Sequence, residues 1–227
     1  MNKSDIQGFD ISGKAAAVIG CGGLGCTVAV HLAGTGIGRL VLADFDTVSE
    51  SNLNRQFLYT ADDIGRPKAE LAAQRLKKYS SASDITAVNK KLCSENELDF
   101  IRGCDTVFLA VDNNEARKLL QKFCAKNKIP LVNGGINGFY GTAYLYVPEK
   151  TPCLDCAGLT GNENKKIISV SSTAGIIGAL QAEIGIKYLL GAEDTAGILH
   201  IYDRGEINKL KIKPQANCGF CGVKKNV

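Results

Sequence analysis

The 227-residue sequence lacks several features that would place it in other classes of protein. Its apolar runs are broken by glycine or charge well before about 20 residues, the length that spans a bilayer. The first five residues, MNKSD, do not begin the apolar stretch of a signal peptide. No segment repeats, and no tract is of low complexity. We therefore expect a cytoplasmic protein without a membrane partner.

The sequence also lacks a concentrated basic surface. Its 27 Lys and Arg residues and 23 Asp and Glu residues give a net charge of only +4, and the basic residues are scattered apart from short pairs. Nucleic-acid-binding proteins more often carry a basic stripe interleaved with aromatics. Nucleic acid is therefore not the expected partner, although the mild positive charge is compatible with an acidic protein.

The nine cysteines do not indicate a disulfide framework, because their number is odd. Four of them form two C-x-x-C pairs, Cys153 with Cys156 and Cys218 with Cys221. Two such pairs can supply four thiolates to one tetrahedral Zn²⁺ in a closed, structural site. A redox motif or an iron–sulfur cluster is the alternative, but redox motifs usually lie at a helix start, whereas these pairs lie in a loop and a tail. Small buried thiols are expected at the other five positions, Cys21, Cys26, Cys93, Cys104 and Cys124.

A glycine-rich turn follows the apolar run 15–19 and opens a stretch with helical character. It contains Gly20, Gly22, Gly23 and Gly25, and three of these fit the pattern G-x-G-x-x-G. Missing side chains let the backbone approach phosphate oxygens, and the free N–H groups of a helix start attract negative charge. Asp44, about twenty residues later, is placed to bind ribose hydroxyls. Taken alone, this pattern predicts a nicotinamide-dependent oxidoreductase.

Strand and helix patterns alternate along the first 135 residues, which predicts an α/β fold of the Rossmann-like type: a mostly parallel sheet with helices on both faces. Expected strands are 14–20, 39–44, 84–89, 105–111 and 129–133, and expected helices are 24–35, 67–79, 94–102 and 114–127. A strand at 142–147 is expected to run antiparallel to these. A loop (148–172), a long helix (173–190) and two short strands (198–203 and 207–212) then lead to the second cysteine pair.

The segments downstream of the glycine turn change the expected ligand. Asp44 and Asp46 lead into a polar loop, and Arg55 in that loop and Lys68 at the next helix start place two cations near the turn. Asp112 follows the fourth strand, at the crevice where open α/β sheets bind ligands. Glycine backbone, two cations and two separated acids fit a triphosphate with Mg²⁺ better than a nicotinamide.

Each of these residues also has an ordinary structural interpretation. Asp112 could cap the helix that follows it, and Arg55 could form a surface ion pair. A glycine turn between a strand and a helix is by itself a weak indicator of chemistry. The functional interpretation depends on finding all of these features together and in this order along the chain.

These motifs resemble the ThiF/MoeB/HesA family, the bacterial relatives of ubiquitin-activating enzymes. The resemblance covers nearly the whole chain, from about Gly13 to Gly222, and extends to the two cysteine pairs. The matching segments are Gly20-Cys21-Gly22-Gly23-Leu24-Gly25-Cys26, Asp44-Phe45-Asp46, Ser51-Asn52-Leu53-Asn54-Arg55-Gln56, Gly65-Arg66-Pro67-Lys68 and Asp112-Asn113.

The resemblance implies an adenylyltransferase that uses ATP and Mg²⁺ to activate the C-terminal Gly-Gly carboxylate of a ubiquitin-like sulfur carrier. It implies that Asp44 holds the ribose, that Arg55, Gln56 and Lys68 contact the phosphates, and that Asp112 binds Mg²⁺. Asp46 and Asn52 belong to the same nucleotide site, and the four pair cysteines match the family's structural zinc. A homodimer is also implied. The whole chain, 1–227, would then be one adenylation domain, with a nucleotide-binding part (13–135) and a carrier-tail and zinc part (136–227).

The chain departs from the family pattern in two places. Family members often begin with a helical segment whose arginine reaches the neighbouring protomer's ATP, whereas the only cation before Ser12 is Lys3. Either Lys3 or another group substitutes, or catalysis is weaker. Relatives that form a covalent carrier intermediate have a cysteine after the first pair, but Ala157 to Ser172 contains none. We therefore expect adenylation without a covalent enzyme–carrier intermediate.

Three other activities remain open at this level: adenylation of a peptide or tRNA-linked carboxylate, carrier binding by an inactive subunit, and nicotinamide-dependent oxidation.

Overall fold

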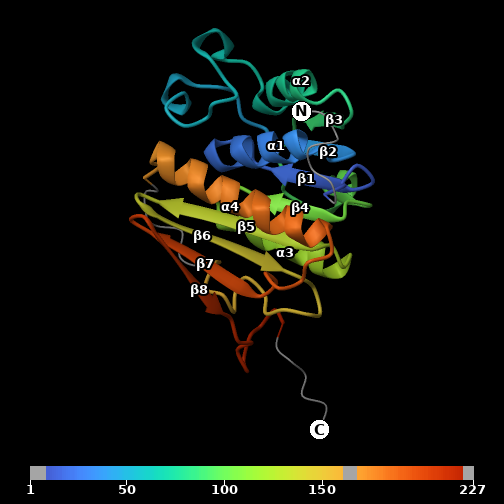
Figure 1. Cartoon of the computed structure of the whole chain (residues 1–227), viewed down its shortest axis with the longest axis vertical. Coiled ribbons are helices and arrows are strands. Elements are labelled where there is room, and N and C mark those ends of the chain that lie inside the picture. The colour runs from blue at the N-terminus through green and yellow to red at the C-terminus, as the bar shows by residue number, and fades with distance from the viewer. Residues whose placement is uncertain (1–8, 161–167, 222–227) are drawn as a thin grey trace.

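A single sheet of eight strands forms the centre of the computed structural model, which describes residues 9–160 and 168–221 (Figure 1). The strands lie in the order β3-β2-β1-β4-β5-β6-β7-β8. Their bounds are β1 (Ala15–Ile19), β2 (Arg39–Ala43), β3 (Asp84–Val88), β4 (Thr106–Leu109), β5 (Leu131–Asn137), β6 (Tyr140–Tyr146), β7 (Ile198–Asp203) and β8 (Glu206–Lys211). The first five are parallel, and the last three add to β5 as antiparallel strands. The predicted Rossmann-like sheet with C-terminal antiparallel strands is confirmed.

Helices lie on both faces of the parallel sheet, so β1, β2 and β4 are apolar and buried on both sides, whereas the edge strand β3 is exposed on one. Ala16 and Val18 of β1 face one core, and Ala17 and Ile19 face the other. Helices α1 (Gly23–Thr35), α2 (Lys68–Tyr79) and α4 (Ser171–Leu189) contribute to the first core, while α3 (Asn114–Lys126) contributes to the second. Figure 1 shows α1 and α4 side by side in front of the sheet, with α3 behind it.

One expected element has a different form in the structure. The segment 94–102 is not a helix but two short 3₁₀ turns, η4 (Glu95–Glu97) and η5 (Asp99–Ile101). The Glu97 carboxylate accepts hydrogen bonds from the N–H groups of Cys93 and Ser94 (2.7 and 2.9 Å), which closes a single tight turn. Leu98 and Ile101 are fully buried, at the three-residue spacing that suits 3₁₀ geometry, and Phe100 is partly buried against the same core.

The segment 148–160 has no regular helix or strand, as expected of a loop, but its centre is not a surface feature. Cys153 and Leu154 are fully buried and belong to the second core. Residues 161–167 of the expected loop lie outside the described residues. Within the described ranges, no helix is both long enough and apolar enough to cross a membrane.

Candidate active site

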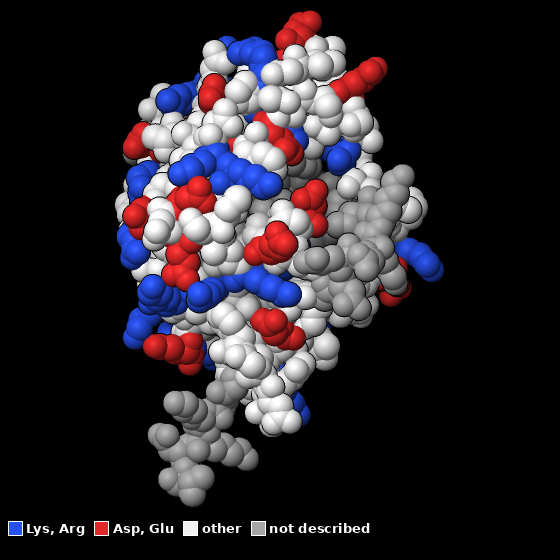
Figure 2. Space-filling view, turned by 180° about the vertical axis from the view of Figure 1, so that it is seen from behind, with Lys and Arg blue, Asp and Glu red and all other residues white. Residues whose placement is uncertain are grey.

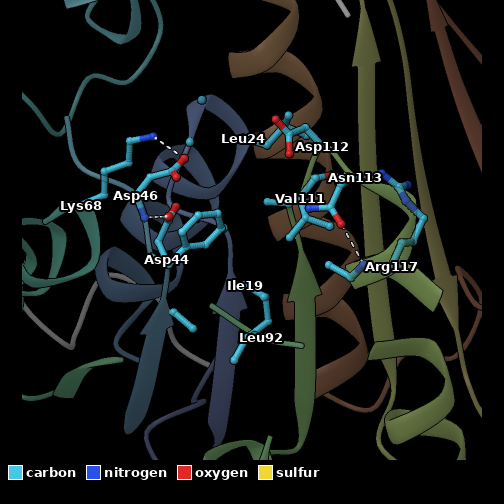
Figure 3. A pocket seen from close by; sticks show the side chains of 18 of the residues that line it. Ile19, Leu24, Asp44, Asp46, Lys68, Leu92, Val111, Asp112, Asn113 and Arg117 are labelled. Atoms are coloured by element: carbon cyan, nitrogen blue, oxygen red, sulfur yellow. Dashed lines mark hydrogen bonds and ion pairs between the residues drawn. The ribbon is translucent and has the colours of Figure 1, made fainter. Parts of the chain in front are cut away.

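A cavity of about 680 Å³ opens at the carboxyl ends of the parallel strands, between β1 and β4. The chain reverses its direction of strand addition between these two strands, and open α/β sheets bind ligands at such a switch point. Figure 3 shows Asp44, Asp46 and Lys68 on one side of this cavity and Asp112, Asn113 and Arg117 on the other. The predicted nucleotide-site residues that line it are Gly20, Gly22, Gly23, Asp44, Asp46, Asn52, Arg55, Gln56, Lys68 and Asp112.

Gly25 is the predicted site residue that does not line the cavity. It lies behind the turn, where a Cβ atom would come within 1.7 Å of the Gly20 carbonyl oxygen. Gly20 itself has a φ of 93° and packs against the carbonyl of Ala110 after β4. The glycines therefore serve two purposes: Gly22 and Gly23 face the cavity, while Gly25 lets α1 pack directly on the turn.

The Asp44 carboxylate ties the end of β2 to the glycine turn. Its Oδ2 accepts a hydrogen bond from the N–H of Cys21 (2.6 Å), and its Oδ1 accepts one from the N–H of Asp46 (2.8 Å). Burial raises the pKa of Asp44 above its ordinary value, while these two hydrogen bonds favour the ionised form. The carboxylate is thus fixed at the edge of the cavity.

Lys68 is a buried cation held at the cavity wall. Its Nζ lies 3.2 Å from Oδ2 of Asp46, with only 6% of the lysine side chain exposed. The Tyr59 hydroxyl donates to the Lys68 carbonyl and also to the Cys21 carbonyl (3.2 and 2.9 Å). One tyrosine therefore joins the start of α2 to the glycine turn.

The loop that follows β2 contributes Asn52, Arg55 and Gln56. Arg55 makes no ion pair within the described ranges; its Nη1 donates to the Ser51 carbonyl (2.9 Å) and to Asn54 Oδ1 (2.8 Å). Gln56 is 97% buried, and its Oε1 has no hydrogen-bond partner among the residues that the structure describes. The alternative interpretation of Arg55, a surface ion pair, is therefore not seen among the described residues.

The other end of this loop is anchored to α2 by an ionic cluster. The Asp63 carboxylate is almost fully buried and pairs with Arg66 (3.2 Å) and Arg75 (2.5 Å). Burial alone would raise the pKa of Asp63, but hydrogen bonds from Thr60 and Arg75 and the charge of Arg75 lower it below its ordinary value. The cluster fixes the path of the chain from Gln56 to Lys68.

The helix cap after β4 is Asn113, not Asp112. The Asn113 side chain accepts a hydrogen bond from the N–H of Ala116 (2.8 Å), as an N-cap does. Asp112 is exposed at the cavity wall, and in the described part of the chain its carboxylate accepts no hydrogen bond. This carboxylate is therefore available for a ligand.

Arg117 is a cavity residue that sequence reasoning missed. Its Nη1 donates to Asn133 Oδ1 (2.7 Å), and its Nη2 donates to the Val111 carbonyl (3.0 Å). Burial lowers the pKa of the guanidinium, and the nearby Asp112 charge opposes this. The sequence does show a cation about one turn inside the helix that follows Asp112. Only the tertiary fold shows that this cation, Arg117, lies at the cavity.

The four cysteines of the two C-x-x-C pairs converge, and all their Sγ atoms lie within 4.8 Å of one another. The Sγ separations are 3.5 Å for Cys153–Cys218, 3.4 Å for Cys156–Cys221 and 3.8 Å for Cys218–Cys221. A tetrahedral ion with Zn–S bonds of about 2.3 Å places its sulfur ligands about 3.8 Å apart. The cluster has the composition and size for such a metal.

The remaining cysteines follow the expectation with one exception. Cys21, Cys26, Cys104 and Cys124 are buried, but Cys93 is exposed and lines the cavity. The tight turn after Cys93 closes through its N–H, so the side chain is left outside the core.

Fold and cavity together define the class of this protein: a Rossmann-like α/β protein with a cavity at the switch point of the sheet. A profile of the ThiF family matches residues 9–222. The chain therefore belongs to the ThiF family, as its motifs predict.

Named relatives resemble the chain over most of its length. It is 34% identical over 212 residues to the sulfur carrier protein ThiS adenylyltransferase of Escherichia coli, covering 90% of this chain and 84% of the relative. It is 34% identical over 232 residues to the molybdopterin-synthase adenylyltransferase of Salmonella typhimurium, covering 96% and 93%. A crystal structure of E. coli MccB with ATP superposes with a TM-score of 0.82 at 24% identity, over 93% of this chain and 67% of that chain, and supports the fold alone.

Proposed function

We propose that this protein is an ATP-dependent adenylyltransferase that activates the C-terminal Gly-Gly carboxylate of a ubiquitin-like sulfur carrier. One observation carries the proposal: segments far apart in sequence bring the glycine turn, Arg55, Lys68 and Asp112 to a single cavity. Its volume of about 680 Å³ lies in the usual range for small-molecule sites. The names of the relatives at 34% identity supply the substrate class.

The proposed reaction is an in-line displacement at the α-phosphorus of ATP. A carboxylate oxygen of the carrier forms a bond to phosphorus, the bond to the bridging α,β oxygen breaks, and pyrophosphate leaves. No general base is needed, because a C-terminal carboxyl is already ionised at neutral pH. The work of the site is alignment and charge stabilisation.

We assign a different part of ATP to each group of cavity residues, according to where the group lies. Backbone N–H groups of the glycine turn would cradle the phosphates. Asp44, already fixed by two hydrogen bonds, would accept from the ribose hydroxyls. Lys68, Arg55 and Gln56 would contact the phosphates from the β2 side. Asp46 would position the Lys68 side chain, and Asn52 the loop that carries Arg55 and Gln56.

Asp112 would hold Mg²⁺. The fit rests on an exposed carboxylate in the cavity wall that accepts no hydrogen bond from the described residues. When bound, Mg²⁺ would neutralise phosphate charge, and it needs few protein carboxylates because water and phosphate oxygens complete its shell.

Cys153, Cys156, Cys218 and Cys221 would hold Zn²⁺ as a structural staple. Four thiolates at tetrahedral separations leave no open coordination position for a reacting water. A single metal site would then join the segment after β6 to the segment after β8.

The transfer stops at the adenylate in this proposal, since Ala157 to Ser172 contains no cysteine. Incubation with carrier and ATP, followed by non-reducing electrophoresis, should show no enzyme–carrier adduct. A DTT-sensitive adduct would contradict the absence of a covalent intermediate.

A homodimer in the cytoplasm completes the proposal, as the family resemblance implies. The role assigned to Lys3 falls on residues outside the described ranges. Light scattering of the purified protein at micromolar concentration would measure the oligomeric state, and a monomer there would contradict the dimer.

ATP–pyrophosphate exchange tests the function. Purified protein with ATP, Mg²⁺ and a carrier ending in Gly-Gly should exchange labelled pyrophosphate into ATP, and exchange should disappear without the carrier. Tight carrier binding without exchange would favour an inactive carrier-binding subunit instead. Exchange with a short peptide but with no carrier would favour a peptide-adenylating enzyme.

A further inference from the structure

A buried guanidinium faces the cavity from the side opposite Lys68. Arg117 is 91% buried, yet it lines the same cavity as Asp112. It lies on α3 behind the ends of β4 and β5, where Val111 and Asn133 accept one hydrogen bond each. Figure 3 shows Arg117 beside Asp112 and Asn113, across the cavity from Asp46 and Lys68.

These two hydrogen bonds leave most of the donor capacity of Arg117 unused. A guanidinium offers five N–H donors. Nη1 and Nη2 have one acceptor each, and Nε is buried with no partner in the described part of the chain. No carboxylate within the described ranges forms an ion pair with Arg117, although the charge of Asp112 is near enough to raise the pKa of the guanidinium against the effect of burial. A buried charge without a counter-ion is costly, and an anionic ligand would remove that cost.

The charges around the cavity indicate where such a ligand would lie. Lys68 and Arg55 lie toward the glycine turn, where the triphosphate is proposed to bind. A second anion that approached the α-phosphorus from the β5 side would meet the negative phosphates and Asp112. Arg117 is the cationic side chain on that wall, so beside the Mg²⁺ proposed at Asp112 it can offset this repulsion at short range.

The wall beside Arg117 suits the main chain of a peptide. Gly134 and Gly135 of β5 line the cavity there without side chains. A Cβ atom on Gly135 would lie 3.5 Å from Oγ1 of Thr142 and 4.0 Å from Nη1 of Arg117, so this glycine lies next to the guanidinium and no side chain of its own fills the cavity there. A Gly-Gly tail is the kind of substrate that such a wall admits.

We infer that Arg117 binds the free C-terminal carboxylate of the polypeptide substrate and so selects it against other groups. This inference rests on the proposed function. Arg117 is thereby a specificity-determining residue for the acyl substrate, separate from the residues that bind ATP. A purely structural Arg117 would instead only join α3 to the ends of β4 and β5.

The direct test compares two forms of one carrier. A ThiS-like carrier that supports exchange is prepared with either a C-terminal carboxylate or a C-terminal carboxamide. Their affinities are measured by calorimetry in the presence of Mg²⁺ and the non-reacting analogue AMPCPP. Wild-type enzyme should bind the carboxylate form roughly tenfold or more tightly, as expected of a charge-assisted hydrogen bond.

Variants assign this preference to Arg117. Arg117→Met should bind both carriers with equal affinity or prefer the carboxamide, whereas its affinity for ATP without carrier should stay within about twofold of wild type. Arg117→Lys keeps the charge but not the planar fork, so it should retain part of the preference. Lys118→Met removes a neighbouring exposed charge on α3 and should leave the preference unchanged.

The outcomes separate the two proposals. If no carrier supports exchange, the adenylyltransferase proposal fails and the role of Arg117 fails with it. If exchange occurs but wild-type enzyme binds both carriers equally, only the role of Arg117 is wrong. That comparison needs no variant, so it stands even if Arg117→Met does not fold. Arg117→Met that is less stable and binds ATP weakly, but retains the carboxylate preference, would show a structural role only.

Discussion

At the scale of single residues, the two walls of the cavity hold their charged groups differently. Lys68 is buried against Asp46, while Asp44 is occupied by two backbone N–H groups. Asp112 and Arg117 on the other wall are near each other but do not form an ion pair in the described part of the chain. Both therefore remain available to ligands of opposite charge.

The first prediction concerns Asp112. Asp112→Ala should lower the rate of carrier-dependent ATP–pyrophosphate exchange by about 10²–10³-fold or more, because a charge-stabilising group of the reaction is removed. The melting temperature and zinc content should not change, since Asp112 is exposed and does not cap α3. Asp62→Ala, at an exposed acid outside the cavity, is the control. Exchange at the wild-type rate in Asp112→Ala would exclude Asp112 as the Mg²⁺ ligand.

The second prediction concerns His200, one of only two histidines. His200 on β7 is 96% buried, and neither ring nitrogen has a partner among the described residues. Burial lowers its pKa, Lys209 and Lys187 lower it further, and Glu183 opposes them. A lowered folded-state pKa means that the unfolded state binds the proton first. Stability should therefore fall as pH drops below about 6.5, the ordinary histidine pKa.

Thermal unfolding between pH 8 and pH 5 measures this effect. Each kcal/mol lost should lower the melting temperature by about 2–4 °C in a protein of this size. His200→Leu should remove part of the decline, whereas His31→Leu, at an exposed position on α1, should not. An identical decline in wild type and His200→Leu would show that His200 is not the responsible group.

At the scale of elements, the junction of β1 with α1 positions the phosphate cradle. Gly25→Ala would push a methyl group into the Gly20 carbonyl, since an ideal Cβ lies only 1.7 Å from that oxygen. We expect a loss of stability of about 3 kcal/mol or more, because the obstacle is backbone and cannot rotate away. Urea unfolding measures the change.

Gly34→Ala in the same helix is the matched control. A Cβ atom there meets nothing within 4 Å. Alanine has the higher helix propensity, so this variant should gain roughly 0.5–1 kcal/mol. A Gly25→Ala variant as stable as wild type would contradict the close approach of α1 to the turn.

Most of the elements could be predicted from the sequence, because apolar periodicity determines buried strands and helices. β5 extends from the expected 129–133 to Asn137, since pairing with β6 continues past Gly134 and Gly135. The predicted helix at 94–102 is wrong, because Ser94 and Glu97 close the chain into a tight turn before a helix can form. Local hydrogen bonding there outweighs the apolar pattern.

The site was predictable where residues follow strand ends in sequence, as Asp44 and Asp112 do. Arg117 was not, because its burial depends on Val111 and Asn133, which reach it through the fold. Gly25 matched the sequence motif but acts in packing. A sequence motif therefore predicts which residues lie at the site, and the tertiary contacts determine the role of each residue.

At the scale of the whole molecule, α3 connects the cavity to the cysteine cluster. Gln121 is buried, and its side chain binds both the N–H of Leu154 and the carboxylate of Asp155 (2.6 Å each). These residues lie between Cys153 and Cys156, while Arg117 lies one turn earlier on the same helix. Loss of the cluster should therefore destabilise the molecule beyond its C-terminal segment.

The metal prediction follows from this connection. The purified protein should contain about one zinc per chain by elemental analysis, and a strong chelator should remove it with a clear drop in melting temperature. Cys218→Ser should reproduce that drop, whereas Cys93→Ser, at the exposed cysteine outside the cluster, should keep both zinc and stability. A chelated protein with an unchanged melting temperature would contradict a structural role for the metal.

The intact mass of the carrier after reaction tests the central claim most directly. A Gly-Gly-ending carrier, ATP, Mg²⁺ and the enzyme are mixed with pyrophosphatase, and the products are analysed at once by mass spectrometry. The account predicts that the carrier gains the mass of one AMP group, that the mass of the enzyme stays the same, and that the carrier gains no mass with Asp112→Ala. A carrier of unchanged mass, alongside ATP consumption that does not depend on the carrier, would contradict it.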